Sequence, residues 1–206
     1  MAYSINAKDY FNTLLYSGNS TARSLTGVGF EPSFTWIKER TATSDHMLFD
    51  QPRGVQKYIS SNLSNSESTS AGMLTAFGSD GFSLGSGNDV NDNGQTYASW
   101  SWKANGQGSS NTDGSINSIY TSANTTSKCS IVKYTGTGSN ATVGHGLGVV
   151  PHSIWIKCTS NSGEDWMVYH RSIGATHYLT LNTTAGDSSG GEVIWNDTLP
   201  TSSVFS

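Results

Sequence analysis

The sequence predicts an all-β fold made of two tandem, related β-sandwich domains of the jelly-roll or concanavalin-like type. Residues 27–38 recur as residues 146–157, with Pro32 matching Pro151 at a spacing of 119 residues (151 − 32 = 119). This spacing exceeds the roughly 20–50 residues of solenoid repeats, so the recurring unit is a whole domain. Short β-rich runs alternate with turns rich in Gly, Asn and Ser, as in sandwiches and barrels. Aromatic residues make up 11% of the chain and provide large side chains for a core.

The repeated stretch predicts a glycine-rich bend followed by a strand. Glycine permits the left-handed backbone of the bend, and Pro32 fixes the entry to the strand at 33–38. Alternation along this strand places Phe34, Trp36 and Lys38 on one face. We expect Trp36 to fill the core of the first copy and Trp155 that of the second.

Further strands follow in both copies at matched positions. The runs 48–50 and 56–60 correspond to 168–170 and 176–180. The first copy then continues through strands at 73–77, 82–85 and 96–102. The last of these places Trp100 and Trp102 on one face, as a structural aromatic pair.

The boundaries follow from composition and from the repeat. We expect a first domain at 1–105, a flexible linker rich in Gly, Ser, Asn and Thr at 106–127, and a second domain at 128–206. The second copy has no counterpart of residues 84–105, so it is predicted to be incomplete. Either the chain is the N-terminal part of a longer protein, or another chain supplies the closing strand.

Composition argues against several classes of partner and site. The net charge of −4 gives no reason to expect nucleic acid, no run is long enough for membrane insertion, and Met1–Ser4 shows no secretory signal. Cys129 and Cys158 could form a disulfide if their strands were neighbours, but free thiols are favoured without a signal peptide.

Each copy carries a set of distinctive motifs. Those of the first copy are Gly27-Val28-Gly29-Phe30, Pro32, Trp36-Ile37-Lys38, Leu48-Phe49-Asp50, Arg53-Gly54, Ser79-Asp80-Gly81-Phe82-Ser83-Leu84-Gly85, Asn91-Asp92-Asn93-Gly94 and Trp100-Ser101-Trp102-Lys103-Ala104. Those of the second are Ser130-Ile131-Val132, Tyr134-Thr135-Gly136, Val143-Gly144-His145-Gly146-Leu147-Gly148, Trp166, Val168-Tyr169-His170, Thr198, and Pro200-Thr201-Ser202-Ser203-Val204-Phe205. Through these motifs the chain resembles a family of structural proteins of tailed phages, mostly tail fibres, many from phages of marine bacteria and cyanobacteria. The second half resembles a companion version of the domain, in which Cys129 departs from an expected aromatic residue.

The resemblance implies a β-sandwich and a role in the virion, assembled in the host cytoplasm. It implies no catalytic residue and no cofactor. Expected partners are other virion proteins and sister chains in a homotrimer, together with a host surface glycan. The protein would then contribute to attachment and host adsorption.

Asp89, Asn91 and Asn93 match the first half of a calcium loop, in which alternating oxygens face the ion. The twelfth position of such a loop should hold a bidentate Glu, but here it is Trp100. Asn93-Gly94 between apolar runs also predicts a hairpin turn, which we favour over a metal site.

Two other functions are weighed against the virion role. A carbohydrate-binding, lectin-like module would use Trp166, Tyr169 and His170, with loops 41–47 and 159–166 as the contact surface, although these aromatics are also candidates for the core. A polysaccharide-degrading enzyme would need paired carboxylates across a cleft, whereas the acidic residues fall in turns. We therefore expect no enzymatic activity.

Overall fold

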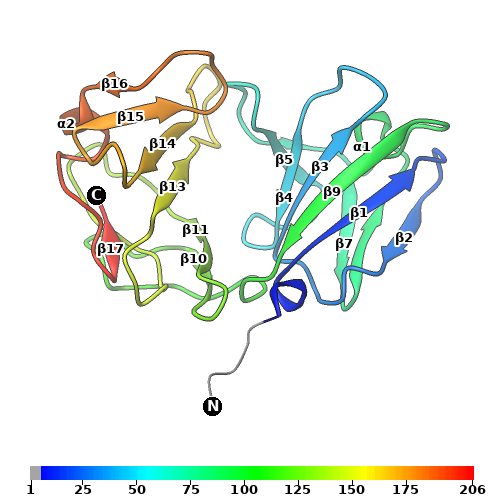
Figure 1. Ribbon diagram of the computed structural model, residues 1–206, viewed down its shortest axis with the longest axis horizontal. Helices are drawn as coiled ribbons and strands as arrows, with labels where there is room; N and C mark the ends of the chain where they lie inside the picture. Colours follow the sequence, from blue (N-terminus) through cyan, green and yellow to red (C-terminus); the bar gives the residue numbers. More distant parts are fainter. Residues whose placement is uncertain (1–5) are drawn as a thin grey trace. The chain divides into compact units, whose positions relative to one another are not determined.

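The computed structural model describes residues 6–206, which are mostly β-strands in antiparallel sheets with very little helix (Figure 1). The segment Met1–Ser4, considered above for a secretory signal, lies outside the described residues. The β-rich part of the prediction is confirmed. Within residues 6–206, no helix has the length and apolar character needed to cross a membrane.

The chain divides into two compact units. Unit 1 holds the described residues up to Ser60 together with Glu67–Gln107. Unit 2 holds Ser61–Ser66 and Gly108–Ser206. Most of the stretch 106–127, for which the sequence predicts a linker, therefore belongs to unit 2.

Unit 1 contains a six-stranded sheet among its described strands, in the order β1-β9-β3-β4-β5-β6. A three-stranded sheet has the order β2-β8-β7. A 3-10 turn η1 (Ala7–Asp9) precedes the first strand, and the short helix α1 (Asn88–Asn91) precedes the last. The strands are β1 (Phe11–Ser17), β2 (Arg23–Thr26), β3 (Phe34–Glu39), β4 (Met47–Asp50), β5 (Lys57–Ser60), β6 (Ser68–Thr69), β7 (Leu74–Gly78), β8 (Gly81–Leu84) and β9 (Thr96–Trp102).

The core of unit 1 is a cluster of apolar side chains drawn from both of its sheets. The larger sheet contributes Ile37, Met47 and Phe49, and the smaller contributes Leu74 and Phe82, all buried. Aromatic and β-branched residues favour an extended backbone in β3, and its burial alternates along the strand.

Trp36 does not fill this core, so the prediction is wrong on that point. Ile37 has 0% exposure and lies in the core cluster. Successive side chains of a strand point to opposite faces, so Trp36 lies on the far face of the sheet, where it is partly buried. The alternation along the strand is confirmed, but the face expected to point into the core is the wrong one.

Unit 2 is made of smaller sheets. Its described strands pair as β10-β11, β12-β17 and β13-β14-β15-β16. A short helix α2 (Gly191–Ile194) follows β16. The strands are β10 (Tyr120–Asn124), β11 (Cys129–Lys133), β12 (Val143–Gly144), β13 (Ser153–Ile156), β14 (Met167–His170), β15 (His177–Thr180), β16 (Ser188–Ser189) and β17 (Val204–Phe205).

The pairing registers of unit 1 recur in unit 2. Trp36 is opposite Leu48, and Trp155 is opposite Val168. In the same way Leu48 faces Ile59 while Val168 faces Leu179, and Leu25 faces Phe82 while Val143 faces Phe205. The sheets β3-β4-β5-β6 and β13-β14-β15-β16 thus share order and register.

Unit 2 packs a core of Tyr169, Ala175 and Trp195, with Ile154 and Ile156 against it. Trp155 is 46% exposed, so it does not fill the second core, and this prediction is also wrong. The isoleucines on either side of Trp155 take the inward face, as Ile37 does in β3.

Candidate functional site

Aromatic side chains form a strip on the face of the six-stranded sheet that points away from the core. The ring centroid of Trp102 is 4.8 Å from that of Phe11 and 5.2 Å from that of Phe34. Trp36 and Trp100 meet edge to face, with centroids 6.2 Å apart. We call these five residues the aromatic strip; Phe11 is 37% exposed and the other four are partly buried. Edge-to-face and tilted pairs at these separations are favourable.

His46 closes one end of the aromatic strip. The indole N–H of Trp36 donates to Nδ1 of His46 at 2.9 Å, so the neutral imidazole carries its proton on Nε2. Burial, aided by the nearby ammonium of Lys38, lowers the pKa of His46. The ring is therefore neutral at pH 7 and serves as an acceptor for Trp36.

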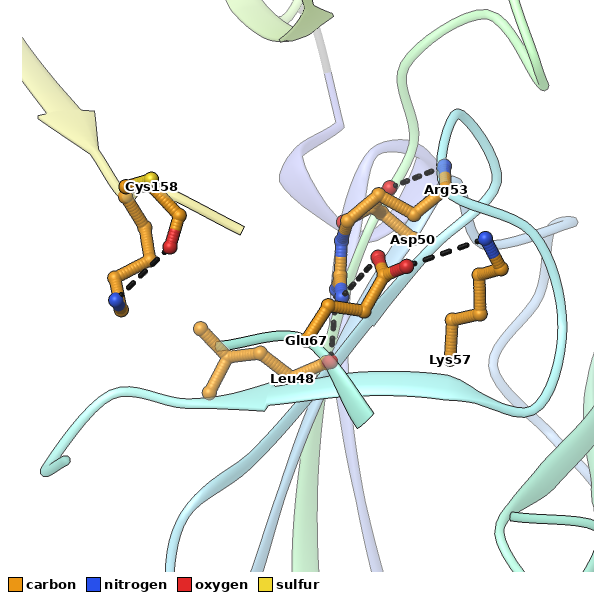
Figure 2. A network of polar contacts seen from close by, with 7 residues as sticks. Leu48, Asp50, Arg53, Lys57, Glu67 and Cys158 are labelled. Atoms are coloured by element: carbon orange, nitrogen blue, oxygen red, sulfur yellow. Dashed lines mark hydrogen bonds and ion pairs between the residues drawn. The ribbon is translucent and has the colours of Figure 1, made fainter. Parts of the chain in front are cut away.

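A network of charged side chains, in which Arg53 and Asp50 are buried, lies at the turn after β4 (Figure 2). The guanidinium of Arg53 donates to Asp50 through Nε at 2.5 Å and to the carbonyl of Leu48 through Nη2 at 2.9 Å. Its Nη1 lies 3.5 Å from Glu67, which also pairs with Lys57 at 3.2 Å. Asp50 in addition accepts from the backbone N–H of Arg53 at 2.9 Å. This network ties the turn to β4 and to the segment that begins β6.

We call β3 and β13, the strands that follow the glycine-rich bends, the signature strands. In both units a lysine near the end of the signature strand holds the loop that follows. Nζ of Lys38 donates to the carbonyls of Glu39 at 2.6 Å and Ala42 at 3.2 Å. Nζ of Lys157 donates to the carbonyls of Cys158, Glu164 and Ser64 at 3.0, 2.8 and 3.1 Å. Burial lowers the pKa of Lys157. Each ammonium group thus holds a loop in place through hydrogen bonds to backbone carbonyls.

The glycine-rich bend is held by a carboxylate. Asp80 accepts from the backbone N–H groups of Gly27 at 3.0 Å and Gly29 at 2.6 Å. Both glycines have positive φ, +98° and +88°, a region that other residues rarely adopt. The spacing of the two glycines therefore lets both N–H groups donate to the same carboxylate.

The residues of the calcium candidate do not form a ligand set in this structure. Asp89 and Asn91 lie in α1, and the Asn91 side chain is buried. Its amide donates to the carbonyls of Thr21 and Gly85, both at 2.8 Å, and its oxygen accepts from the N–H of Asn19 at 3.1 Å. Asn93 is exposed. Across residues 6–206, no three His, Cys, Asp or Glu side chains gather in a metal-binding group.

The three residues predicted to form a carbohydrate-binding surface differ in their solvent exposure. Trp166 and Tyr169 are 5% and 2% exposed, whereas His170 is exposed. Tyr169 packs edge to face against Trp195, with centroids 5.9 Å apart. The exposed aromatic of unit 2 is instead Trp155, whose indole N–H donates to Ser153 at 3.0 Å. Ser153 lies opposite His170 in the sheet.

The two cysteines are free thiols in this structure. Burial raises the pKa of Cys129 to about 11, so this thiol stays protonated at neutral pH. Hydrogen bonds from Ser160 and Asn161 lower the pKa of Cys158, with the Ser160 hydroxyl as the largest cause.

Sequence reasoning missed two features of this site. Phe11 and Phe34 belong to the aromatic strip because they lie opposite Trp102 on both neighbouring strands. Only the pairing register shows this, and registers between distant strands are not visible in the sequence. The Arg53 network could have been suspected from Asp50 and Arg53, which are three residues apart in a turn.

The chain was compared with known families, proteins and structures. A family model described as domain of unknown function (DUF7483) matches residues 6–206. No curated protein and no solved structure matches the chain.

Proposed function

The chain belongs to the DUF7483 family, and we propose that it is a structural protein of a tailed-phage particle, in a tail fibre or fibre-like appendage. It would be assembled into the virion in the host cytoplasm and would contribute to attachment and host adsorption. Its partners would be other virion proteins and sister chains in a homotrimer. The motifs described above support this role by resemblance.

The aromatic strip is the observation that carries the proposal. It joins three strands, β1, β9 and β3, on the sheet face opposite the core, and Phe11 leaves part of it exposed. Contiguous apolar surface of this kind marks protein interaction sites. The charged groups described above hold loops through backbone groups: Arg53 and Lys157 donate to carbonyls, and Asp80 accepts from N–H groups. This distribution of side chains suits a protein that packs against its neighbours.

Light scattering coupled to size exclusion tests the assembly role. We expect a trimer for the unaltered chain and a shift towards monomer for Phe11→Ser, which removes the most exposed ring of the strip. Thr13→Ser, on the same face of the same strand, is the matched control and should leave the assembly unchanged. A strict monomer at high protein concentration would count against the proposal.

A carbohydrate-binding module is the second candidate, and Trp155 is the observation that favours it. Its ring is 46% exposed beside the hydroxyl of Ser153, an arrangement that can stack on a sugar and hydrogen-bond to it. This moves the candidate platform away from the buried Trp166 and Tyr169. A host surface glycan would be the ligand.

A glycan array separates this candidate from the first. Binding that is lost in Trp155→Ala and kept in Val193→Ala, an exposed control on α2, would support the lectin function. Reducing-end release from host polysaccharides tests the remaining alternative, a polysaccharide-degrading enzyme. We expect none.

A further inference from the structure

The sheets β3-β4-β5-β6 and β13-β14-β15-β16 carry different polar side chains at matching positions. In unit 1, ion pairs join Asp50, Arg53, Lys57 and Glu67 into one network (Figure 2). In unit 2, the shared strand order, register and turn length place four other residues at those positions: His170, Ile173, His177 and Asp187. No ion pair joins these four among the described residues, so their polar groups are not occupied by one another.

Trp155, Ser153 and His170 share the outer face of the unit 2 sheet. Ser153 lies opposite His170, and Trp155 is two residues further along β13, so all three side chains point to the same side. The alternating residues Ile154 and Ile156 pack on the core instead. The indole N–H of Trp155 donates to the Ser153 hydroxyl at 3.0 Å, so this edge of the ring is turned towards the row that holds His170.

His177 and Asp187 continue this row of polar groups across the sheet. The register between β14 and β15, continued by two residues, brings His177 opposite His170. Asp187 directly precedes β16, which pairs with the start of β15. At the same two backbone positions of unit 1, the Lys57 ammonium and the Glu67 carboxylate lie 3.2 Å apart. Side chains at the positions of His177 and Asp187 can therefore reach one common ligand.

These groups keep hydrogen-bonding capacity for a ligand. His170 and Asp187 are exposed, and His177 is partly buried. Nδ1 of His170 accepts from the Ser172 N–H at 3.3 Å, so Nε2 of the neutral ring carries a proton that it can donate. Nδ1 of His177 pairs with the Thr176 hydroxyl at 3.0 Å, which leaves Nε2 for a further hydrogen bond. The Asp187 carboxylate provides acceptors.

We propose that Trp155, Ser153, His170, His177 and Asp187 form a binding site for the pyranose ring of an uncharged sugar. The apolar face of such a ring stacks on the indole, which is 46% exposed. Its hydroxyls donate to the carboxylate and accept from the imidazole N–H groups. This inference rests on the carbohydrate-binding function proposed above and is independent of the virion role.

The charges of the site select against acidic sugars. The positions of Arg53 and Lys57 hold Ile173 and His177 in unit 2, so neither fixed cation of the unit 1 network is present. The carboxylate of Asp187 disfavours a second carboxylate beside it. A sialic or uronic acid therefore binds less well than an uncharged sugar of similar shape.

A glycan array tests the class of ligand with the full chain. It carries neutral oligosaccharides of glucose, galactose and mannose, together with their sialylated or uronic acid forms. We expect saturable binding of a neutral oligosaccharide, and binding weaker by about ten-fold for its acidic form. A preference for the acidic forms would overturn the proposed site, although the carbohydrate-binding function would stand.

Titration calorimetry of the neutral oligosaccharide that binds most tightly then locates the site. His177→Ala and Asp187→Asn should each weaken binding by about ten-fold, as the loss of a hydrogen bond to a charged or buried group does. The matched controls His152→Ala and Glu192→Gln replace exposed residues outside the site and should leave the affinity unchanged. Near-ultraviolet circular dichroism verifies that each variant is folded.

The possible results separate the site from the function on which it rests. Binding that is lost in Trp155→Ala but unchanged in both His177→Ala and Asp187→Asn would overturn the site and leave the carbohydrate-binding function standing. Absence of binding to every glycan by the folded, unaltered chain would overturn both.

Discussion

At the scale of single residues, burial assigns different roles to neighbouring side chains in the signature strands. Ile37 is 0% exposed in the core of unit 1, whereas Trp155 is 46% exposed. We expect Ile37→Ala to lower the free energy of unfolding by about 3 kcal/mol, the sum of lost transfer energy and a cavity. Trp155→Ala should change it by less than about 1 kcal/mol, as surface substitutions do.

Urea unfolding followed by circular dichroism measures both changes. The order of the two effects is the critical result. A larger loss for Trp155→Ala than for Ile37→Ala would show that the assignment of the inner face is wrong.

Arg53 offers a second prediction at this scale. Its side chain is 6% exposed and Asp50 beside it is 7% exposed, so Arg53→Met leaves a buried carboxylate without its cation. We expect a loss of about 3 kcal/mol in the free energy of unfolding. Lys57→Met removes a partner of Glu67 that is 38% exposed and should cost at most about 1 kcal/mol. Equal effects of the two substitutions in urea unfolding would contradict the role of Arg53.

Alternation in the sequence predicted which residues of a strand share a face, but not which face is the core. Phe34, Trp36 and Lys38 do lie on one side of β3. The period of two is the same whichever face of the strand points into the core. The large indole side chains suggested that their own face does, and this is wrong. The core face is decided by the opposing sheet, whose Leu74 and Phe82 pack in the same cluster as Ile37. That sheet is distant in sequence.

At the scale of elements, Asn91 connects α1 to the turn after β1 and to the end of β8. Its side chain is buried and makes three hydrogen bonds to backbone groups. Asn91→Ala would leave the buried carbonyl of Gly85, and the partly buried carbonyl of Thr21 and N–H of Asn19, without this partner, so we expect a loss of about 3 kcal/mol in the free energy of unfolding.

Asn93→Ala is the matched control for the Asn91 substitution, because Asn93 is exposed. Thermal unfolding with and without millimolar calcium should be measured on both variants and on the unaltered chain. A melting temperature that rises with calcium in the unaltered chain, but not in Asn91→Ala, would revive the metal site.

The strands themselves were largely predictable, since the runs 33–38, 48–50, 56–60, 82–85 and 96–102 all coincide with strands within a residue or two. Their β-branched and aromatic residues between glycine-rich turns carry that information. The helix α1 was missed, because a single turn of helix and a hairpin turn share the same polar residues. The helix is held in place by Val90, whose side chain is fully buried in the core of unit 1.

At the scale of the whole molecule, two histidines link stability to pH: His145, which is buried, and His46, which is partly buried. Burial lowers the pKa of His145, although the Thr201 carbonyl and the Asp113 carboxylate act in the opposite direction. Its Nδ1 accepts from the N–H of Leu147 at 3.1 Å, so protonation there would break that bond. The pKa of His46 is lowered too. Both rings bind protons more tightly in the unfolded chain than in the folded one.

The stability contributed by these neutral rings is therefore complete above the unfolded pKa of about 6.5 and declines as the pH falls below it. We expect the free energy of unfolding to be lower at pH 5.5 than at pH 7.5. The doubly substituted chain His46→Gln, His145→Gln should show a smaller difference between the two pH values. An unchanged difference would show that neither ring is the source.

The internal repeat was the most informative global feature of the sequence, since it anticipated which strand pairings recur. The candidate site could not be predicted in the same way. The aromatic strip depends on registers between β1, β9 and β3, and the exposure of Trp155 depends on β13 lacking a second neighbour among the described strands. Both follow from pairings between segments far apart in the chain, to which local sequence patterns carry no signal.

The membership of Ser61–Ser66 in unit 2 has a practical consequence for dissecting the protein. If the chain were divided after Gln107, the N-terminal fragment would keep Ser64 and Ser66, which belong to unit 2. The Ser64 carbonyl accepts from Gly163 at 3.0 Å, and the Ser66 N–H donates to Ser162 at 3.1 Å, so both hydrogen bonds would be lost from the separated fragments. Recombinant halves split at that point would therefore each lack native partners. Deletion mapping of this protein has to take into account that a segment of unit 2, Ser61–Ser66, lies within the sequence of unit 1.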